Sequence, residues 1–393
     1  MRRICHIITG LNVGGAERHL AALLQRLRND AQKPGFDHEV VSLLDPGPMA
    51  DELGRVPVFS LGMGRGLSTP HKWPAAIRRL ARLMESRPPD LIQTWMYHAD
   101  FMGTAARRFA VWPGNTPPPL VWGLRNAYVS SNAVRLTTRM LITVLARLSR
   151  RKAVPAAIVA PSHAAVRIHA DLGYAADKFR VIPSGVDTNR FAPDSGARQR
   201  LNEAAGIADP GALFVGLVSR WDQVKDVPGF LDAIAALPER TVARCAFLLL
   251  GSGLSESNAE LAGLVARHPR KESIRMLGVR NDIAELLPGL DLAVNSSRGE
   301  SLPMAVLEAM ACGVPCIATD VGDTARAVGN TGRIVPPSDP AALAEAIDAL
   351  LRLPQTERRT MGDASRKRIL EQYDLQRSAS QYAELYRSLT DST

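Results

Sequence analysis

Cysteine is scarce in this sequence: its 393 residues contain only four, at positions 5, 245, 312 and 316. Their spacing does not match a zinc site, and so few cysteines cannot form the disulfide framework of a small secreted domain. The simplest interpretation is a reduced, cytoplasmic protein. Cys312 and Cys316 flank a predicted turn, and we interpret both as small buried side chains rather than as a redox pair.

Long apolar runs are missing too, because no stretch reaches the roughly 18 residues that a membrane-spanning helix needs. The N-terminal MRRICHIITGLNVGG begins like a signal peptide. However, His6 and Thr9 interrupt a short apolar part that ends in a glycine-rich turn. We therefore predict a buried first strand. Hydrophobic residues make up 46% of the chain and charged residues 22%, which is typical of a globular protein and argues against disorder.

Acidic residues are under-represented in the first half of the chain. Residues 1–200 hold 28 Lys and Arg against 14 Asp and Glu, whereas residues 201–393 hold 20 against 25. A basic half beside an acidic half indicates two domains with different partners, and a chain of this length is too long for one core. The positive charge fits an anionic membrane surface or a phosphate-bearing lipid, and it would also fit a nucleic acid.

Short apolar runs alternate with helical patterns along the chain. In the first half, strands are predicted at 3–9, 38–44, 89–95, 120–126, 157–162 and 179–187, and helices at 16–28 and 73–87. In the second half, strands are predicted at 212–220, 245–253, 274–279, 292–297 and 314–322, and helices at 227–237, 281–290 and 341–353. Such alternation predicts an α/β protein with two doubly wound, Rossmann-like parallel-sheet domains.

A segment rich in Pro, Gly and charge, 191–212, separates the two series of strands. We therefore predict a first domain over 1–200 and a second over 201–370. The last residues, 371–393, are predicted to be helical and, because they follow a complete second sheet, are free to pack elsewhere. Open α/β sheets bind ligands at the carboxyl ends of their strands, so the site is expected in the cleft between the domains.

The stretch RGESLPMAVLEAMACGVPC, residues 298–316, is predicted to form a loop, an apolar helix and a turn. Pro303 suits the first helical position and Gly313 the exit, so the free N–H groups and the dipole of the helix N-terminus suit a phosphate. Glu300 before the helix and Glu308 on its body have no packing use, whereas carboxylates bind sugar and ribose hydroxyls. The alternative is that Glu300 caps the helix and Glu308 faces solvent.

Three other strand-end loops are candidates for the same site. Arg220 and Lys225, five residues apart in one loop, could reach both phosphates of a diphosphate or could be solvated surface charges. The LGSG loop, which contains Gly251, allows a ligand to approach the backbone closely, although turns use glycine everywhere. Val279 and Arg280 could bring backbone groups to a nucleobase, and an ordinary turn explains them equally well.

Four motifs together resemble one family. GESLPMAVLEAMACGVPCIATDVGD resembles the Glu-x7-Glu signature of the large retaining glycosyltransferase family 4, which has the GT-B fold. GLNVGGAERHL resembles the family's N-terminal Gly-Gly-Ala-Glu loop, and VSRWDQVKD resembles its phosphate loop. FRVIPSGVDTNRFAP resembles the segment before its domain linker. The resemblance covers nearly the whole chain, and the motifs together are a much stronger signal than any one of them.

The resemblance implies that a sugar is transferred, with retention, from a nucleotide-diphosphate sugar to a glycan or lipid-linked acceptor in cell-envelope polysaccharide or glycolipid synthesis. Glu300 would bind the transferred sugar and Glu308 the ribose. Arg220 and Lys225 would hold the diphosphate and offset its charge as it departs. The other donor contacts would come from Gly15, Gly251, Val279, Arg280, Ser301, Leu302 and Pro303. The C-terminal helix would pack back on the first domain.

Ser184 replaces the family's usual Asn before Gly185, with little expected effect, and two other segments depart from the family pattern. Asp226 follows Lys225 where the family often has Gly, so that turn is expected to differ. Many relatives carry His-x-His after the strand that corresponds to LIQTW, at positions that are Gln93 and Trp95 in this sequence. His98 remains, and we predict that it is catalytic and lies near the acceptor. A histidine paired structurally at the start of a helix is the alternative.

The sequence contains no Asp-x-Asp, the motif that anchors a metal-bound diphosphate in the other glycosyltransferase fold. Basic side chains and a helix end would then stabilise the leaving group. We therefore predict metal-independent transfer, with no metal ligand and no cofactor.

Residues 133–152, AVRLTTRMLITVLARLSRRK, form a cationic amphipathic pattern. Such a helix could lie on an anionic membrane, which would place the protein at the inner face of the cytoplasmic membrane and would fit a lipid-linked acceptor. Alternatively, it could cover a sheet and keep its arginines in solvent. No nucleic-acid partner is predicted.

Three rival functions differ from the transferase. An epimerase or hydrolase of the same fold would act without an acceptor. A nicotinamide dehydrogenase is disfavoured because TGLNVGGAE lacks Gly-x-Gly-x-x-Gly and no acidic ribose partner ends the second strand. A non-catalytic nucleotide-sugar-binding relative is favoured by the missing His-x-His and disfavoured by the intact basic and acidic motifs.

Overall fold

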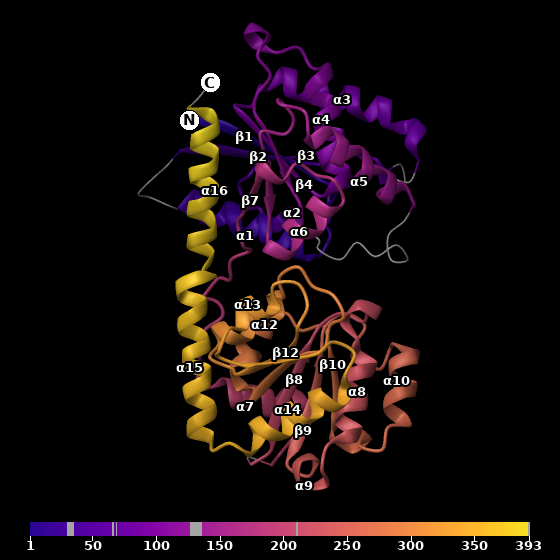
Figure 1. Ribbon diagram of the computed structural model, residues 1–393, viewed down its shortest axis with the longest axis vertical. Helices are drawn as coiled ribbons and strands as arrows, with labels where there is room; N and C mark the ends of the chain where they lie inside the picture. Colours follow the sequence, from indigo (N-terminus) through magenta and orange to yellow (C-terminus); the bar gives the residue numbers. More distant parts are fainter. Residues whose placement is uncertain (30–34, 65–66, 68, 126–135, 210, 392–393) are drawn as a thin grey trace. The chain divides into compact units, whose positions relative to one another are not determined.

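The structure is a computed structural model that describes residues 1–29, 35–64, 67, 69–125, 136–209 and 211–391. The chain divides into two compact units (Figure 1). Unit 1 comprises Met1–Gly185 and Leu375–Thr393, and unit 2 comprises Val186–Asp374.

Unit 1 is built on a parallel sheet in the order β3-β2-β1-β4-β5-β6-β7. The strands are β1 (Arg2–Ile8), β2 (Phe36–Ser42), β3 (Val58–Ser60), β4 (Leu91–Trp95), β5 (Leu120–Gly123), β6 (Ala157–Ala160) and β7 (Phe179–Val181). In register, Ile4 of β1 faces His38 of β2 on one side and Leu91 of β4 on the other. The helices are α1 (Gly15–Asn29), α2 (Met49–Glu52), α3 (Trp73–Ser86), α4 (Tyr97–Phe109), α5 (Leu136–Ser149), α6 (His163–Asp171) and α16 (Leu375–Thr390).

Unit 2 has a second parallel sheet in the order β10-β9-β8-β11-β12-β13. Its strands are β8 (Leu213–Val218), β9 (Cys245–Leu250), β10 (Ile274–Gly278), β11 (Leu292–Asn295), β12 (Cys316–Thr319) and β13 (Arg333–Val335). Its first helices are α7 (Ala197–Ala205), α8 (Val227–Ala236), α9 (Glu239–Val242), α10 (Ala259–Ala266) and α11 (Ile283–Leu286). The remaining helices are α12 (Met304–Ala311), α13 (Thr324–Val328), α14 (Pro340–Arg352) and α15 (Gln355–Gln372). The predicted α/β fold with two Rossmann-like sheets is confirmed.

Short 3-10 helices connect several of these elements. They comprise Pro70–Lys72, Pro113–Asn115, Ala176–Lys178, Gln223–Lys225, Lys271–Ser273 and Leu287–Gly289. The turn over Gln223–Lys225 matters for the candidate site, because it carries one of the predicted phosphate-binding residues.

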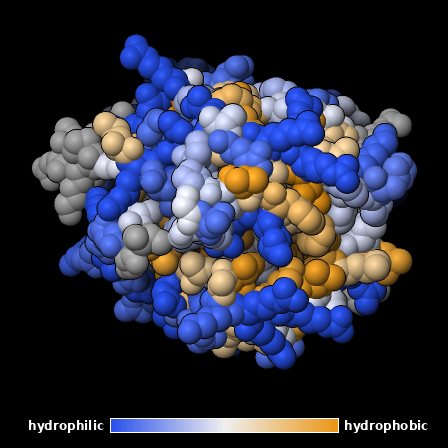
Figure 2. Space-filling view, turned by 90° about the horizontal axis from the view of Figure 1, so that it is seen from above, coloured by the Kyte–Doolittle hydropathy of each residue, from blue (hydrophilic) through white to orange (hydrophobic). Residues whose placement is uncertain are grey.

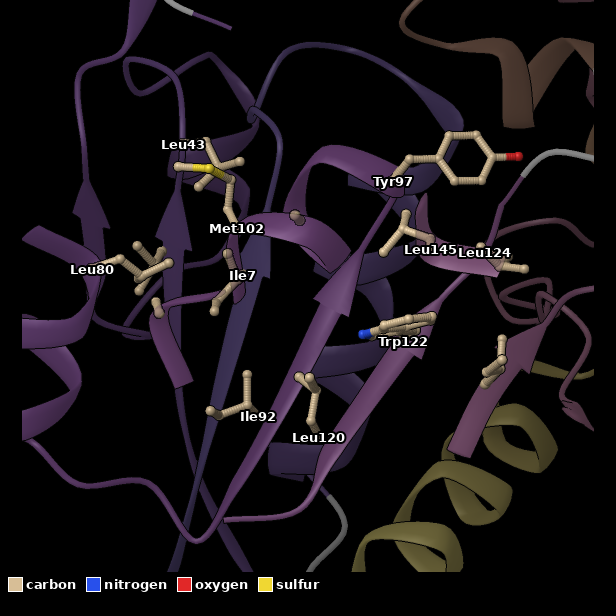
Figure 3. Packing of buried hydrophobic residues seen from close by; sticks show 14 of the residues in the cluster. Ile7, Leu43, Leu80, Ile92, Tyr97, Met102, Leu120, Trp122, Leu124 and Leu145 are labelled. Carbon is tan, nitrogen blue, oxygen red and sulfur yellow. The ribbon is translucent and has the colours of Figure 1, made fainter. Parts of the chain in front are cut away.

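The core of unit 1 fills the space between its sheet and the covering helices (Figure 3). Ile7 on β1, Ile92 on β4 and Trp122 on β5 belong to one buried cluster with Leu80 of α3 and Met102 of α4. Because parallel strands are buried on both faces, most side chains of β4, β5 and β6 are apolar.

The segment around the predicted boundary packs inside unit 2. Phe191 and Leu201 are buried in a core cluster of that unit, and Arg198 Nη1 donates to Asp291 Oδ2 at 2.7 Å. The two units therefore divide after Gly185, earlier in the chain than the expected boundary near residue 200. Composition marks irregular segments, but it does not show which core such a segment joins.

The C-terminal segment contributes to both units. α15 contacts α12 of unit 2, and the helical path is interrupted at Tyr373 and Asp374. α16 packs against α1 and β4 of unit 1, where Tyr382 and Tyr386 are fully buried.

Candidate active site

The candidate site of unit 2 lies where the strand order of its sheet reverses. β8 and β11 are neighbours at the middle of the sheet, and ligands of open parallel sheets bind at the carboxyl ends of strands at such a point. The loop after β8 carries Arg220 and Lys225, and the loop after β11 carries Glu300. The fold therefore gathers three of the predicted residues at one edge of one sheet.

Glu300 is held by three donors. Its Oε1 accepts from Lys225 Nζ at 2.5 Å, from Ser297 Oγ at 2.8 Å and from Asn295 Nδ2 at 3.3 Å. The side chains of Lys225 and Glu300 are only 22% and 10% exposed. The structure thus brings together the residue predicted for the diphosphate and the residue predicted for the sugar as a partly buried ion pair.

Asn295 and Ser297 were not among the predicted site residues. Both lie in the polar run NSSRGE, which begins at the last residue of the otherwise apolar strand β11, and this run is the signal that could have identified them. Ser297 is itself anchored, since Thr319 Oγ1 donates to its carbonyl oxygen at 2.5 Å. The carboxylate is therefore oriented by side chains that are fixed to the sheet.

Arg220 lies in the same loop as Lys225, but it pairs with Asp222 and not with Glu300. Its Nε donates to Asp222 Oδ2 at 3.1 Å, and its side chain is 66% exposed. Asp222 also begins the turn over Gln223–Lys225, because its Oδ1 accepts from Val224 N at 2.9 Å. An anionic ligand would have to compete with a single exposed carboxylate for this guanidinium.

The helix after Glu300 begins one residue later than predicted. α12 starts at Met304, and Pro303 occupies the cap position with φ −80° and ψ 92°, so its placement at the first helical position was wrong. The reason is that the extended ψ of Pro303 keeps it outside the helix. Gly313, with φ +75°, ends the helix as predicted. Leu302 is buried, and the carbonyl oxygen of Ser301 accepts from Asp323 N at 3.1 Å.

Gly322 closes the loop around Glu300. It has φ +60°, and a Cβ at this position would clash with the carbonyl oxygen of Glu300. Only glycine allows the segment after β12 to lie against this backbone. Two neighbouring strand-end loops therefore support the carboxylate through main-chain packing.

Glu308 lies half-buried on the body of α12. Burial, and to a lesser extent the charge of Glu308, raises the pKa of the Cys312 thiol to about 12. Burial also raises the pKa of Cys316. Buried thiols of raised pKa are inert, which agrees with our interpretation of Cys312 and Cys316 as packing residues.

The other two predicted loops differ in character. Gly251 has φ +133°, and a Cβ there would clash with the carbonyl oxygen of Ser219, so this glycine is required by packing within the unit. Val279 is 66% exposed. Arg280 makes a two-pronged pair with Asp282, with Nε–Oδ1 and Nη2–Oδ2 distances of 2.8 and 2.6 Å, which raises the pKa of Arg280 and lowers that of Asp282.

Unit 1 places its predicted residues at its own switch point, between β1 and β4. Gly15 begins α1 after β1, and a Cβ at Gly15 would meet open space, whereas one at Gly14 would clash with the carboxylate of Glu17. Burial raises the pKa of Glu17. The carboxylate of Glu17 therefore folds back towards the helix N-terminus, where the dipole favours negative charge.

His98 lies in the first turn of α4, directly after β4. Its ring meets Trp73 edge-on with a centroid distance of 6.3 Å, and burial lowers its pKa. The preceding Met96 has φ +77°, and its N–H donates to the carbonyl oxygen of Gly123 at 2.9 Å. A non-glycine residue in this conformation marks a strained turn, and such turns cluster at functional sites.

Gln93 and Trp95, at the positions of the family's His-x-His, are fully buried. Trp95 Nε1 donates to His6 Nδ1 at 3.3 Å, and Gln93 Oε1 accepts from the hydroxyl of Tyr386 at 3.4 Å. Both side chains are therefore committed to the interior of unit 1, and His98 is the histidine that follows this strand.

Among the described residues, no group of three or more His, Cys, Asp and Glu side chains is arranged to hold a metal ion. In the same part of the chain, every helix is too short or too polar to cross a membrane.

Two units, each with a parallel sheet whose strand order reverses near its middle, have the architecture of the GT-B fold. The family models agree: "Glycosyltransferase Family 4" matches residues 13–190, and "Glycosyl transferases group 1" matches residues 209–353. The chain belongs to the retaining glycosyltransferase family 4, also called group 1.

Curated relatives share about a third of aligned residues. The putative glycosyltransferase EpsF of Bacillus subtilis strain 168 is 28% identical over 332 residues, which cover 81% of this chain and 79% of EpsF. N-acetyl-alpha-D-glucosaminyl L-malate synthase of Bacillus anthracis is 31% identical over 48% of each chain. Lipopolysaccharide core biosynthesis mannosyltransferase LpsB of Rhizobium meliloti is 35% identical over 44% of this chain and 50% of its own. The match to the last two spans about half of their length.

Solved structures share the fold over the whole chain. Anabaena Alr3699/HepE, solved in complex with UDP, has a TM-score of 0.80 at 22% identity and covers 99% of this chain and 100% of its own. Sucrose-phosphate synthase from Thermosynechococcus elongatus has a TM-score of 0.82 at 21% identity and full coverage of both chains. These likenesses confirm the GT-B fold.

Proposed function

We propose that this protein transfers a hexosyl group from a nucleotide-diphosphate sugar to a glycan or lipid-linked acceptor, with retention at the anomeric carbon, in cell-envelope polysaccharide or glycolipid synthesis. The observation that carries the proposal is the partly buried pair between Lys225 Nζ and Glu300 Oε1 at the switch point of unit 2. Further support comes from HepE, which was solved with UDP-glucose, and from LpsB, which is a mannosyltransferase.

The chemistry follows from charge. When the bond between the anomeric carbon and the phosphate oxygen breaks, the diphosphate leaves with the electron pair and gains negative charge. Lys225, Arg220 and the N–H groups at the start of α12 would stabilise this charge, and fixed donors are effective because they need no reorganisation during the reaction. In this proposal, the site works without a metal ion.

The two carboxylates, Glu300 and Glu308, would bind hydroxyl groups of the donor. Glu300, already oriented by Ser297 and Asn295, would accept hydrogen bonds from the transferred sugar, and Glu308 from the ribose. The loops that contain Gly251 and Arg280 would contribute backbone contacts to the rest of the donor.

The acceptor hydroxyl must lose a proton as its oxygen bonds to the anomeric carbon. We assign His98 to the neighbourhood of this hydroxyl. Burial lowers its pKa and so favours the neutral ring, which is the form that can accept a proton or a hydrogen bond near neutral pH.

An anionic membrane surface is part of the same proposal. On α5, Leu136, Met140 and Val144 recur every four residues and are 70%, 63% and 38% exposed. Arg139 and Arg147 are exposed on the same helix. The opposite face of α5 is buried, so the helix covers its sheet and also exposes an apolar ridge beside cations, a combination that suits an anionic bilayer. Residues 133–135 of the predicted segment lie outside the described residues.

Other hydrophobic side chains are exposed on unit 1 as well. Phe109 and Val111, at the end of the neighbouring α4, are 67% and 73% exposed. Figure 2 shows a face of the molecule on which hydrophobic residues gather among predominantly hydrophilic ones. A cytoplasmic protein held at the inner face of the membrane would meet a lipid-linked acceptor there.

A thermal-shift screen tests the donor assignment. UDP, UDP-glucose, GDP and GDP-mannose are each added in excess. The ligands that carry one of the two bases, uracil or guanine, are expected to raise Tm by about 2 °C or more. Arg220→Ala should weaken the effect of the bare diphosphate, whereas Glu300→Ala should remove only the extra effect of the sugar. If none of the four shifts Tm, the assignment is wrong.

A donor-only incubation separates the transferase from an epimerase or hydrolase of the same fold. The nucleotide sugar that stabilises the protein is incubated without acceptor, and the sugar is analysed by NMR. The proposed transferase should leave most of the donor intact, whereas rapid epimerisation or complete hydrolysis would favour the alternative.

A further inference from the structure

One arginine ties the two loops of the candidate site together. The backbone N–H of Arg298 donates to Val224 O at 2.7 Å, and its Nη2 donates to Asp226 Oδ1, also at 2.7 Å. Val224 and Asp226 flank Lys225, and Arg298 lies two residues before Glu300. Arg298, in the loop that carries Glu300, therefore contacts the residues on both sides of Lys225 in the other loop.

Ser296, in the loop after β11, also contacts the backbone around Lys225. Its hydroxyl lies 2.9 Å from the carbonyl oxygen of Lys225 and 3.0 Å from that of Asp226. Ser296 is buried. The backbone of Lys225 is thus held against the loop after β11 on both sides of its own Cα.

Asp226 has an unusual backbone for a residue with a side chain. Its φ of +49° and ψ of +47° lie in the left-handed region, where the side chain of a non-glycine residue has an energetic cost. Glycine, which the family often has at this position, would avoid that cost. The side chain must therefore contribute something that offsets the strain.

The Asp226 carboxylate is nearly inaccessible and has a defined place. It is 4% exposed, its Oδ1 accepts from Gly229 N at 3.3 Å at the start of α8, and a Cβ at Gly229 would lie 2.6 Å from its Oδ2. Arg298, 52% exposed, supplies the opposite charge. A buried carboxylate is costly without its cation, so the pair holds both loops in one arrangement.

We propose that the Asp226–Arg298 ion pair is a positioning device that sets the contact between Lys225 and Glu300, and through it the orientation of Glu300 towards the donor sugar. The inference rests on the proposed function. Asp226 and Arg298 touch neither the sugar nor the phosphates in this scheme, so they act through Lys225 and Glu300 as positioning residues.

The test measures how much the sugar adds to nucleotide binding. Calorimetry gives Kd for UDP and UDP-glucose and for GDP and GDP-mannose, and the ratio of diphosphate Kd to nucleotide-sugar Kd is the readout. Arg298→Ala and Asp226→Asn should each lower this ratio about fivefold, because a misplaced carboxylate loses its hydrogen bonds to the sugar. Arg298→Lys, which keeps the charge, should recover most of the ratio.

Two controls separate positioning from a purely structural role. In a Glu300→Gln background, Arg298→Ala should change the ratio by less than about twofold, because the residue it acts through is already altered. Arg270→Ala, which removes an ion pair with the exposed Glu239 at the surface of unit 2, should leave the ratio unchanged. Asp226→Asn tolerates the left-handed backbone, so it remains informative if Arg298→Ala unfolds.

Two results would overturn the inference alone. One is a fall in Tm with no change in the ratio for Arg298→Ala and Asp226→Asn. The other is an equal effect of Arg298→Ala with and without Glu300→Gln. Failure of the wild-type protein to bind any of the four nucleotides would overturn the proposed function, and this inference with it.

Discussion

At the scale of single residues, the Lys225–Glu300 pair has a fixed geometry before any ligand arrives. Three donors converge on one carboxylate oxygen: Lys225 from the other loop, Asn295 at the end of β11, and Ser297 in the loop that carries Glu300. Such preorganisation reduces the cost of ordering side chains when a ligand binds. It also makes the ammonium of Lys225 available at a defined place for a second phosphate.

Lys225→Met should therefore selectively weaken the binding of nucleoside diphosphates. The substitution keeps the apolar stem and removes the charge, so we expect about a tenfold or greater loss of affinity for UDP or GDP, whichever the wild-type protein binds. Affinity for the corresponding monophosphate should change less than about twofold, since it lacks the outer phosphate. Calorimetry measures both.

Lys271→Met, at a surface 3-10 turn of the same unit, serves as the matched control and should bind like the wild-type protein. An equal loss for mono- and diphosphate in Lys225→Met would show that the ammonium does not contact the outer phosphate.

Residue types and spacing identified Lys225 and Glu300, but not the contacts that hold them. Asn295, Ser297 and Arg298 precede Glu300 directly, and their roles depend on how the backbone of one loop meets that of another. The pairing of Arg220 with Asp222 is local, but it could not be predicted either, since it depends on side-chain orientation in the loop. The roles of the predicted site residues in donor binding stay predictions.

At the scale of elements, α12 is set in place by two glycines. Gly313 ends the helix, and Gly362 of α15 lies so close that a Cβ there would clash with the carbonyl oxygen of Gly313. α15 thus packs backbone to backbone against the turn that follows α12. The position of the helix that begins beside Glu300 depends on this contact.

Gly362→Ala should destabilise unit 2 by about 1–3 kcal/mol, because the added methyl group must displace backbone rather than a flexible side chain. Gly263→Ala in α10 is the matched helical control: its Cβ would lie 3.5 Å from the flexible Arg267, so we expect a change of about 0.5–1 kcal/mol in the stabilising direction. Urea unfolding followed by circular dichroism measures both. Equal effects at the two positions would contradict the close packing of α15.

The sequence predicted most of the strands, but it missed several helices, including the 13-residue α4, and the shortest strands. β3 and β13 are three-residue strands at the edges of their sheets, too short to show a periodic pattern. The break between α15 and α16 was also missed, because no Pro or Gly in residues 364–389 marks a helix end at Tyr373 and Asp374. Elements at edges and junctions are fixed by neighbours far away in sequence, which no local pattern reports.

The exposed ridge of α5 should bind anionic vesicles. We expect co-sedimentation with vesicles of phosphatidylcholine containing about 30% phosphatidylglycerol, and little with phosphatidylcholine alone, because cations on the helix attract anionic headgroups. Met140→Glu should lower the bound fraction about fivefold by placing a charge on the apolar ridge.

Leu370→Glu, at an exposed apolar position on α15, should bind as the wild-type protein does. Raising the salt concentration should weaken binding through screening. Equal binding to neutral and anionic vesicles, or to the wild-type protein and Met140→Glu, would exclude the ridge as the docking surface.

At the scale of the whole molecule, the fold was predicted because both halves repeat one strand–helix pattern around a separate core. Unit 1 differs from unit 2 in burying several histidines. His6, His19 and His38 are each at most 6% exposed, and burial lowers the pKa of all three, that of His38 to about 4. These histidines make the stability of unit 1 sensitive to acid.

The hydrogen bonds of the histidine pair explain why protonation of either ring is unfavourable. The indole of Trp95 can only donate, so His6 Nδ1 accepts from it at 3.3 Å and the His6 proton lies on Nε2. His6 Nε2 then donates to His38 Nδ1 at 3.0 Å. A second proton on either ring would face an existing N–H. Protonation therefore breaks a buried hydrogen bond and introduces an unpaired charge.

Unit 1 should accordingly lose stability as the pH falls from about 6.5 towards 4. A histidine whose folded pKa is depressed binds protons in the unfolded state first, so ∂ΔG/∂pH is positive in this window, and a shift from 6.5 to about 4 corresponds to about 3 kcal/mol for His38. The raised pKa values of Glu17 and Asp100 would make unit 1 more stable as the pH falls. Only these two carboxyl groups oppose the three buried histidines.

Urea unfolding at a series of pH values, followed by tryptophan fluorescence, measures this dependence for unit 1, because four of the five tryptophans, at 73, 95, 112 and 122, belong to it. His38→Gln keeps a side chain that can accept from His6 and cannot be protonated. It should therefore flatten the dependence between pH 6.5 and 4, whereas His163→Gln, at an exposed position on α6, should leave it unchanged. The same slope in His38→Gln and the wild-type protein would show that the buried pair does not govern the acid response.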